Sequence, residues 1–375
     1  MVAAGFTPGE ADHLRRSMAA WKRSGGLEHF RQRLLDGMRA RGYQEAFAER
    51  IFHQIEGFGE YGFPESHSAS FALLAYVSAW LKRHEPAAFV CALLNSQPMG
   101  FYAPAQLIQD AVRHGVEVRA VDVLVSEWES TLEDRAPGSR QAVVRLGLGR
   151  IKGLKQEAAA RIVAARGQGA FTDVTDLARR AGLDRGTVRV LSQGGALATL
   201  VGNRHHASWA ALGIETPLEV LPEARIREAA PLLRTPGEGE DIVADYAKLG
   251  FTLGRHPLAL LREHLHRRRC LTAADIASAE PGQRIRTAGL VISRQRPGTA
   301  TGVVFVTLED ETGIINLIVW ANLVEAQRRE LLHAQLLGVV GEVQRDGEVV
   351  HVIAQRLSDH SPLLGRLKAA SRDFH

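Results

Sequence analysis

The stretch Gly57–Phe89, GFGEYGFPESHSASFALLAYVSAWLKRHEPAAF, is the most informative segment of this chain. Glycine-spaced aromatic residues precede a Ser-His-Ser cluster, and a mostly apolar run follows until Pro86 closes it. A run of this length predicts a helix over residues 66–85, which a proline ends because it cannot continue the hydrogen-bonding pattern. The polar cluster then lies at the start of the helix, and the basic turn 81–84, LKRH, lies at its end.

Both ends of this predicted helix carry residues with two interpretations. Ser66, His67 and Ser68 can donate hydrogen bonds to an anionic ligand at a helix N-terminus, and Lys82 and Arg83 can contact a nucleic-acid backbone. Alternatively, Ser66 is an N-cap, His67 is a surface residue, and the basic pair is a solvated helix end. Local chemistry favours neither interpretation. A hydrolase is disfavoured, because the chain lacks a Gly-x-Ser-x-Gly elbow and adjacent Ser and His seldom face each other in a helix.

Composition sets wide bounds on the class of protein. A chain of 375 residues is enough for about two to four domains. Hydrophobic residues make up 45% and charged residues 23%, as expected of a soluble globular protein. The formal net charge of +4 permits a polyanionic partner without requiring one. No apolar run is long enough to span a membrane, and we expect a cytoplasmic protein.

Cysteine and histidine usage predicts no metal site. The two cysteines, Cys91 and Cys270, form no motif, so neither a disulfide nor a zinc framework is expected. The pairs His205-His206 and His264-x-His266 lack carboxylate or cysteine partners at ligand spacing. A helix-capping pattern begins directly at Thr7, and we therefore expect the chain to be a piece of a longer protein.

The pattern of elements predicts a multidomain α+β protein that is mostly helical in its first third. Helices are expected at 11–23, 27–41, 45–56, 66–85, 87–95 and 103–115, and alternating valines predict a strand over 116–125. Residues 217–241 are rich in Pro, Glu and Gly and are expected to form a linker. Five evenly spaced strands follow, at 284–293, 302–309, 314–320, 336–344 and 348–356, with a helix at 322–332. A helix between the third and fourth of five strands is the order of an OB-fold β-barrel.

OB-folds bind single strands through aromatic stacking and basic grooves. Arg294 and Arg296 lie in a turn that contains Gly and Pro, which favours contact with phosphate; Arg345 is a third basic candidate. Phe305 and Trp320 are the aromatic candidates. Each sits in an apolar strand run, however, and this favours a place in the core of the barrel.

The segment 146–166, LGLGRIKGLKQEAAARIVAAR, predicts a helix-hairpin-helix motif. In such a motif a tight glycine turn delivers backbone N–H groups to a DNA phosphate without reading sequence. Lys152 and Gly153 lie in this turn, and Lys155 replaces the usual second glycine and adds a cation. A poorer second copy is predicted over 176–196, around its Gly-Leu-Asp turn. The alternative is a helical hairpin that merely packs.

Together these segments resemble the C-terminal portion of a bacterial C-family DNA polymerase, the polymerase III alpha subunit, in its error-prone branch. Residues 61–89 resemble the family's YGF-x-x-SHS-A fingers signature, and 146–166 resemble its tandem helix-hairpin-helix region. The segment 247–257, AKLGFTLGRHP, resembles the one before the family's OB-fold. Residues 371–375 resemble the terminus of the error-prone branch, and the resemblance covers essentially the whole chain.

The resemblance implies a DNA-directed DNA polymerase, a nucleotidyltransferase that uses deoxynucleoside triphosphates and Mg²⁺ in translesion synthesis and repair. The family's catalytic aspartates belong to a palm domain upstream of the fingers, and no matching motif is present here. We therefore expect this chain to lack catalytic residues and metal ligands and to be inactive alone. The alternative is a non-catalytic DNA-binding or scaffold protein of a repair complex.

The resemblance also assigns roles to candidate residues. It puts residues 66–68, Lys82 and Arg83 near the incoming nucleotide or template, and Lys152, Gly153 and Lys155 on duplex phosphates. Arg294, Arg296 and Arg345 would contact single-stranded template. The family's clamp-binding peptide, of the type Gln-x-x-Leu-Phe, is missing at 214–219. We expect the sliding clamp to be reached indirectly, through a mutasome accessory protein.

The expected domains follow from these assignments. Residues 1–120 form the fingers, 121–212 the helix-hairpin-helix region, 213–280 a linker and helical connector, 281–360 the OB-fold, and 361–375 a C-terminal tail.

Overall fold

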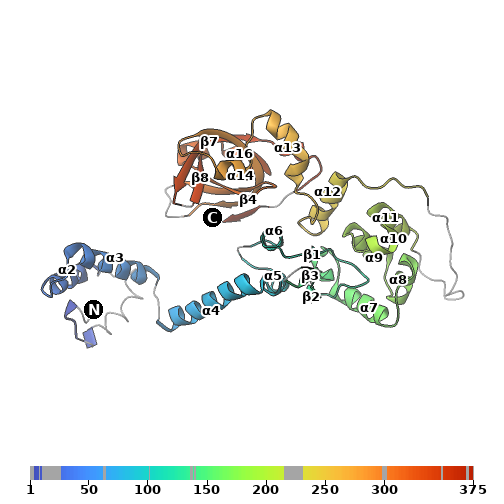
Figure 1. Cartoon of the computed structure of the whole chain (residues 1–375), viewed down its shortest axis with the longest axis horizontal. Helices are drawn as coiled ribbons and strands as arrows, with labels where there is room; N and C mark the ends of the chain where they lie inside the picture. The colour runs from blue at the N-terminus through green and yellow to red at the C-terminus, as the bar shows by residue number, and fades with distance from the viewer. Residues whose placement is uncertain are drawn as a thin grey trace. The chain divides into compact units, whose positions relative to one another are not determined.

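Figure 1 shows the computed structural model of the chain. The structure describes residues 4–7, 9–10, 27–61, 65–100, 102–135, 138, 141–214, 231–297, 302–347, 349–368 and 371–374. These residues belong to two compact units, Met1–His84 and Glu85–His375. The predicted helix at 11–23 lies outside the described residues.

The first unit contains three helices, α2 (Leu27–Arg39), α3 (Glu45–Tyr61) and α4 (Glu65–His84). Apolar side chains three and four positions apart give α2 and α3 facing stripes that pack together. Their buried core consists of Ala4, Phe6, Leu34, Leu35, Met38, Ala48 and Phe52. The predicted helices at 27–41 and 45–56 are confirmed, and α3 continues through two glycines to Tyr61. The predicted helix at 66–85 is confirmed as α4.

The second unit begins with two predicted helices, α5 (Pro86–Asn95) and α6 (Pro104–Arg113). A small sheet follows, in the order β1 (Val118–Arg119), β3 (Val143–Arg145) and β2 (Thr131–Glu133).

The prediction of one strand over 116–125 is wrong, because only Val118–Arg119 forms a strand. Beyond it the backbone turns at Asp122, whose carbonyl accepts from the Val125 and Ser126 amides. The Val123 amide donates to the Ala196 carbonyl, outside any sheet. Val121 and Val123 are nevertheless buried, in a core that the helices provide.

Short helices carry the next part of this unit. They are η3 (Leu148–Arg150), α7 (Gln156–Gly167), α8 (Val174–Arg180), α9 (Arg185–Gln193), α10 (Ala198–Val201) and α11 (Arg204–Leu212). Three further helices lead to the barrel: α12 (Glu238–Lys248), α13 (Pro257–Arg267) and α14 (Ala273–Ala277). Most of the predicted linker, 217–230, lies outside the described residues, and α12 already begins inside its last part.

The last part is a five-stranded barrel, which confirms the predicted OB-fold. Its strands are β4 (Arg284–Gln295), β5 (Val304–Glu309), β6 (Ile314–Val319), β7 (Leu336–Asp346) and β8 (Val349–Asp359). The order β5-β6-β8-β7-β4 closes through an additional β4–β5 pairing. Strand β4 pairs with β7 along its first half and with β5 along its second half. Its register with β5 shifts between Val291 and Ser293, where the two halves meet.

Two details of the barrel differ from the sequence-based expectation. The single predicted helix at 322–332 is two short helices, α15 (Ala321–Ala326) and α16 (Arg328–His333), separated at Gln327. The predicted tail contains the 3-10 turn η4 (Ser361–Leu364) and the strand β9 (Arg372–Phe374), which pairs in parallel with the end of β4.

Polar contacts connect the barrel to the helices of the second unit. Glu309, at the end of β5, is buried, and its Oε1 accepts from Gln109 Nε2 of α6 at 2.7 Å. Nε2 of His256, the N-cap of α13, lies 3.1 Å from the same oxygen. Arg204 of α11 forms ion pairs with Asp241 and Asp245 of α12.

Candidate nucleic-acid interface

The predicted fingers residues all lie on α4. Its first turn begins at Glu65, so the backbones of Ser66 and His67 are helical, and their side chains lie outside the described residues. The side chains of Ser68, Lys82 and Arg83 are exposed. The basic residues occupy the last turn of the helix, as the sequence predicted. Cations there also interact favourably with the negative end of the helix dipole.

Helix α4 also exposes much of its apolar surface. Large exposed side chains run along it: Phe71, Leu73, Leu74, Tyr76, Val77 and Trp80. The Trp80 ring stacks on His84 with centroids 4.8 Å apart. Contiguous apolar surface of this kind usually marks a contact surface.

The first hairpin turn joins η3 to α7. Ile151 and Leu154 are buried and anchor the turn on the core beneath it. Between them Gly153 has a φ of +89°, a conformation that costs glycine nothing and any other residue some strain. A Cβ at this glycine would meet nothing within 4 Å, so the turn is open on its outer side. A flat partner can therefore approach the backbone closely here.

Lys155 is the N-cap of α7, and its side chain makes no cap hydrogen bond. Among the described residues, neither the Gly153 amide nor the Lys155 amide donates a hydrogen bond. The first-turn amides of a helix have no intrahelical acceptor either. The exposed ammonium of Lys155 stands beside these donors. Backbone donors and a cation together are what a phosphate group requires.

Lys152 is exposed, but its backbone amide and its ammonium group both have neighbours at the end of α12. Its amide donates to the Lys248 carbonyl at 2.8 Å, which attaches the turn to the end of α12. A Cβ built on Gly250 would lie 3.5 Å from Lys152 Nζ, so the ammonium lies close to the same helix end. Of the two lysines in this turn, Lys155 is the one with no such neighbour.

The second hairpin turn, between α8 and α9, repeats the backbone of the first. Gly182 has a φ of +58°, and Leu183 is buried as Leu154 is. The residue after it differs, because Asp184 caps α9 and accepts from the Thr187 amide at 2.7 Å. Hydrogen bonds from Thr187 hold the pKa of Asp184 below its usual range, with a smaller contribution from the charge of Lys155. An ionised carboxylate at this cap occupies the donors and repels phosphate.

On the barrel, the prediction that Phe305 and Trp320 are core residues is wrong. Phe305 is 38% exposed and Trp320 is 52% exposed. Phe305 is directly opposite Ile318, and even-numbered residues of β6 face outward while odd-numbered ones are buried. Trp320 continues this even series just beyond the strand. The outer face of β5 and β6 thus carries two aromatic rings.

The exposed arginine Arg296 lies close to this aromatic face in the strand register. It follows Gln295, which pairs with Phe305 across β4 and β5. A cation beside exposed rings is the combination by which OB-folds hold single strands.

The other two predicted barrel arginines have structural partners. Arg294 is 6% exposed, and its guanidinium donates to the carbonyls of Leu331 and Ala334 and to Ser371 Oγ, each within 2.6–2.7 Å. It cannot reach a template strand from this position, so the expectation of DNA contact is wrong for Arg294. Arg345 is exposed and donates to the Ala277 carbonyl at 2.7 Å, at the C-terminal end of α14.

Sequence reasoning missed two exposed cations, Arg284 and Arg286, on the first half of β4. The alternation Arg-Ile-Arg inside a predicted strand was the available signal, since it puts both guanidinium groups on one face. Within the described ranges, no group of three or more His, Cys, Asp and Glu side chains gathers as a metal site would require. No helix there is long and apolar enough to cross a membrane.

The two hairpin turns and the barrel face define a nucleic-acid-binding protein. Family models agree with this class: a helix-hairpin-helix motif matches residues 115–207, and an OB-fold nucleic acid binding domain matches 285–359. A third model, the finger domain of the bacterial DNA polymerase III alpha subunit, matches residues 1–42.

The whole chain is similar to part of several curated proteins. The chain is 63% identical to an error-prone DNA polymerase of Alkalilimnicola ehrlichii, over all of this chain and 36% of that protein. Error-prone DNA polymerases of Azoarcus sp. and Methylococcus capsulatus are 59% and 57% identical, with 35% and 37% of their lengths covered. The chain is similar along its whole length to these error-prone DNA polymerases, as the resemblance predicted, and it spans about a third of their length. A solved asparaginyl-tRNA synthetase from Pyrococcus horikoshii is 22% identical over 27% of this chain and 24% of its own, with a TM-score of 0.22.

The contrast between Arg294 and Arg296 gives a first prediction. Arg294→Ala should lower the free energy of unfolding of the barrel by about 2–5 kcal/mol, because buried carbonyls lose their donors. Arg296→Ala should change it by less than about 0.5 kcal/mol. Hydrogen exchange of barrel peptides in urea measures both. Equal effects of the two substitutions would contradict the assignment of Arg294 to the barrel structure.

Proposed function

We propose that this chain holds DNA for an error-prone DNA-directed DNA polymerase that acts in translesion synthesis and repair. The observation that carries the proposal is the first hairpin turn, with free amides and Lys155 beside them, in a chain similar along its whole length to such polymerases. In this proposal the hairpin turn binds the duplex, the barrel holds the single-stranded template, and α4 belongs to the fingers near the incoming nucleotide.

The hairpin contributes position rather than sequence recognition. Backbone amides and a lysine contact phosphate oxygens, which every sequence presents alike. A polymerase that copies damaged templates needs contacts that do not depend on sequence, since any sequence can occur in the template. The proposal puts the duplex on the first turn and not the second, because Asp184 presents a negative charge there.

The barrel contributes stacking. Phe305 and Trp320 offer π-faces on which unpaired bases can stack without regard to their identity. Arg296 supplies the adjacent cation for the backbone, and Arg345, although bonded to α14, can add its remaining donors. Ser66, His67, Ser68, Lys82 and Arg83 remain the proposed nucleotide and template contacts of α4.

Chemistry at the primer end requires groups beyond those described. Mg²⁺ in a polymerase orients the triphosphate and neutralises its charge, and carboxylates hold it. Among the described residues no three or more His, Cys, Asp and Glu side chains gather together, and we assign none of the described carboxylates to this task. Within the whole polymerase, then, the described residues would bind and position DNA and nucleotide.

The contact with a sliding clamp is proposed to be indirect. Residues 214–219 lack a Gln-x-x-Leu-Phe peptide, and 215–219 lie outside the described residues. We propose that an accessory protein in the bacterial cytoplasm connects the polymerase to the clamp. Capture of purified clamp by this chain with no third protein present would contradict that arrangement.

Lys155→Ala tests the hairpin. It should weaken binding of duplex DNA and lower the slope of log affinity against log salt concentration by about 1, the value for one lost phosphate contact. Fluorescence anisotropy over a salt series gives both quantities. Lys368→Ala, which removes an exposed lysine from the far end of the chain, is the matched control. An unchanged slope in Lys155→Ala would count against the hairpin contact.

Trp320→Ala tests the barrel face. The affinity for single-stranded DNA should fall by about 1–3 kcal/mol, the usual worth of one base stacked on an aromatic ring. The salt dependence should stay as it is, since no cation is lost. Leu332→Ala removes an exposed apolar side chain from α16 and should leave binding unchanged. Equal losses in both variants would show that general surface change, not stacking, is responsible.

Primer extension tests whether this chain binds and positions DNA without catalysing nucleotide transfer. This chain with Mg²⁺, deoxynucleoside triphosphates and primed template should give no extension, while a whole error-prone polymerase should extend the same primer. The reason is that positioning groups alone do not supply the dominant electrostatic stabilisation. Template-dependent extension by the purified chain would overturn this statement.

A further inference from the structure

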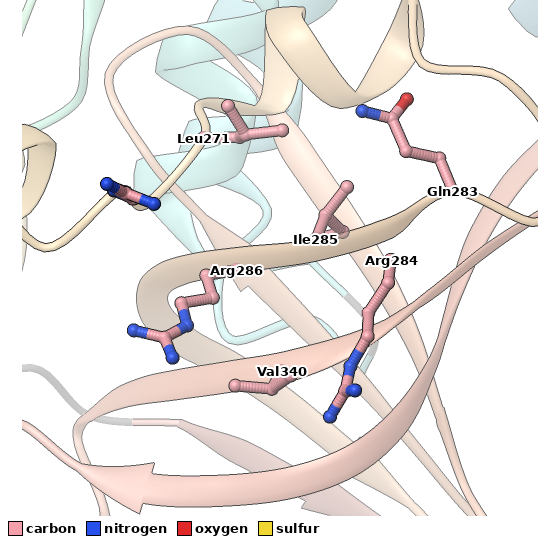
Figure 2. Close-up of a pocket in the computed structure, with 7 residues that line it drawn as sticks. Leu271, Gln283, Arg284, Ile285, Arg286 and Val340 are labelled. Atoms are coloured by element: carbon pink, nitrogen blue, oxygen red, sulfur yellow. The ribbon is translucent and has the colours of Figure 1, made fainter.

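A second basic surface lies on the barrel, on strands other than those that carry the aromatic rings. It is a hollow of about 610 Å³ lined by Arg269, Leu271, Gln283, Arg284, Ile285, Arg286 and Val340. Figure 2 shows Arg284 and Arg286 extending from the same side of β4, with Val340 of β7 near them and Ile285 on the opposite side. This is the pleat of a strand with its apolar residue inward and its two cations outward.

The third arginine of the hollow, Arg269, has an unusual backbone. It follows α13, where the Cys270 amide donates to the Leu265 carbonyl and the Arg269 amide to the His266 carbonyl. These two bonds form a Schellman motif, whose left-handed position normally holds glycine. Arg269 has a φ of +59° and is the one described non-glycine residue with a positive φ. An arginine held in a glycine conformation is strained, and residues with such strain cluster at functional sites.

The charges of the hollow are not neutralised by their neighbours. Among the residues that the structure describes, Arg269, Arg284 and Arg286 have no carboxylate within ion-pair distance and donate no hydrogen bond. Glu342 faces Arg284 across the strands, and it is exposed and not paired with it.

A fourth exposed cation extends the row. Arg356 of β8 is the cross-strand partner of Val340 on the side opposite to Arg286. Burial raises the pKa of the nearby Cys270 thiol, while the charges of Arg262, Arg268 and Arg286 act to lower it. Of these three arginines, Arg262 is ion-paired with Asp310 and Glu311, whereas Arg286 has no such partner among the described residues.

We propose that Arg269, Arg284 and Arg286 form a phosphate-binding site for the sugar–phosphate backbone of a DNA strand. The proposal rests on the DNA-holding function proposed above and adds a second contact surface to it. Guanidinium forks bind phosphate oxygens in a bidentate manner. Positions i and i+2 of a strand lie about 6.6–6.8 Å apart, close to the separation of consecutive phosphates in an extended strand.

The lining of the hollow separates this role from base recognition. It contains no aromatic ring, and its apolar part is Leu271, Ile285 and Val340. A strand that passes here would be held by its phosphates alone, with its bases turned elsewhere. The aromatic face lies on β5 and β6, whereas the arginine site lies on the first half of β4 and the residue after the C-cap of α13. One strand could use the first for its bases and the second for its backbone.

The test uses the whole chain and two probes, oligo-thymidylate and an abasic oligonucleotide of the same length. The double variant Arg284→Ala/Arg286→Ala should lose at least tenfold in affinity for both probes at low salt, with a salt slope lower by about 2. Arg328→Ala/Arg329→Ala removes two exposed arginines from α16 and is the matched control. Wild-type affinity in the first double variant overturns the arginine site, whereas a wild-type chain that binds neither probe overturns the proposed function.

A single variant distinguishes a binding role of Arg269 from a structural one. Arg269→Gly should raise the urea midpoint of unfolding, because glycine adopts this φ without strain. The same change should lower the affinity for the abasic probe about threefold or more. A variant that is more stable and binds normally would overturn the role of Arg269. Pyrophosphate is the last probe: binding of pyrophosphate at the hollow with no effect of the arginine variants on DNA would assign the site to a free anion instead.

Discussion

The buried carboxylate of Glu309 is the contact on which the arrangement of the second unit depends. It ends β5, accepts a hydrogen bond from α6, and lies beside His256 at the start of α13. A buried carboxyl group is costly unless neighbouring groups donate to it, and here only Oε1 has such neighbours while Oε2 has none among the described residues, so loss of either contact would add to the cost. The Lys152–Lys248 backbone bond attaches the first hairpin turn to α12 in the same unit. The hairpin and the barrel thus each have polar contacts to helices of the same unit.

The two hairpin turns show how little separates a binding turn from a packing turn. Both have a glycine with positive φ and a buried leucine. They differ in the cap and in the bonds around the glycine. The Gly182 amide donates to the Arg179 carbonyl and the Gly182 carbonyl accepts from Arg161, whereas the Gly153 amide donates no bond among the described residues. A carboxylate at Asp184 completes the hydrogen bonds of α9 internally, whereas Lys155 leaves those of α7 to an outside acceptor. Completing the cap favours stability and leaving it open favours binding, and the chain contains one example of each.

The sequence was sufficient for the elements whose pattern is local. The barrel strands, α4 and the hairpins follow from periodicity and from turn glycines, and the motifs in them identified the family. The wrong predictions concern the burial of individual side chains. Val121 and Val123 alternate like a strand but are buried on helices. Phe305 was assigned to the core from its apolar neighbours, although strict alternation along β5 turns it outward. The burial of Val121 and Val123 cannot be derived from their own segment, because it depends on which surface another segment covers, whereas the alternation of Val304, Val306 and Leu308 already indicated that Phe305 faces outward.

Arginine shows the same limit most clearly, because five arginines of the barrel have three different environments. Arg294 is buried and serves as a donor to backbone carbonyls, and Arg345 closes the end of α14. Arg284, Arg286 and Arg296 are exposed. The environment of each arginine depends on whether carbonyl groups without another donor lie near its guanidinium group. Only the closed barrel determines this. A charge whose donors are already used adds little to the attraction of a polyanion at short range, so the formal net charge of +4 is a poor guide to DNA binding. The exposed arginines proposed to contact DNA lie on two separate surfaces, Arg296 beside the aromatic rings and Arg284 and Arg286 on the first half of β4. A DNA strand held by both would be sensitive to the loss of either, even though the charge of the whole chain would hardly change.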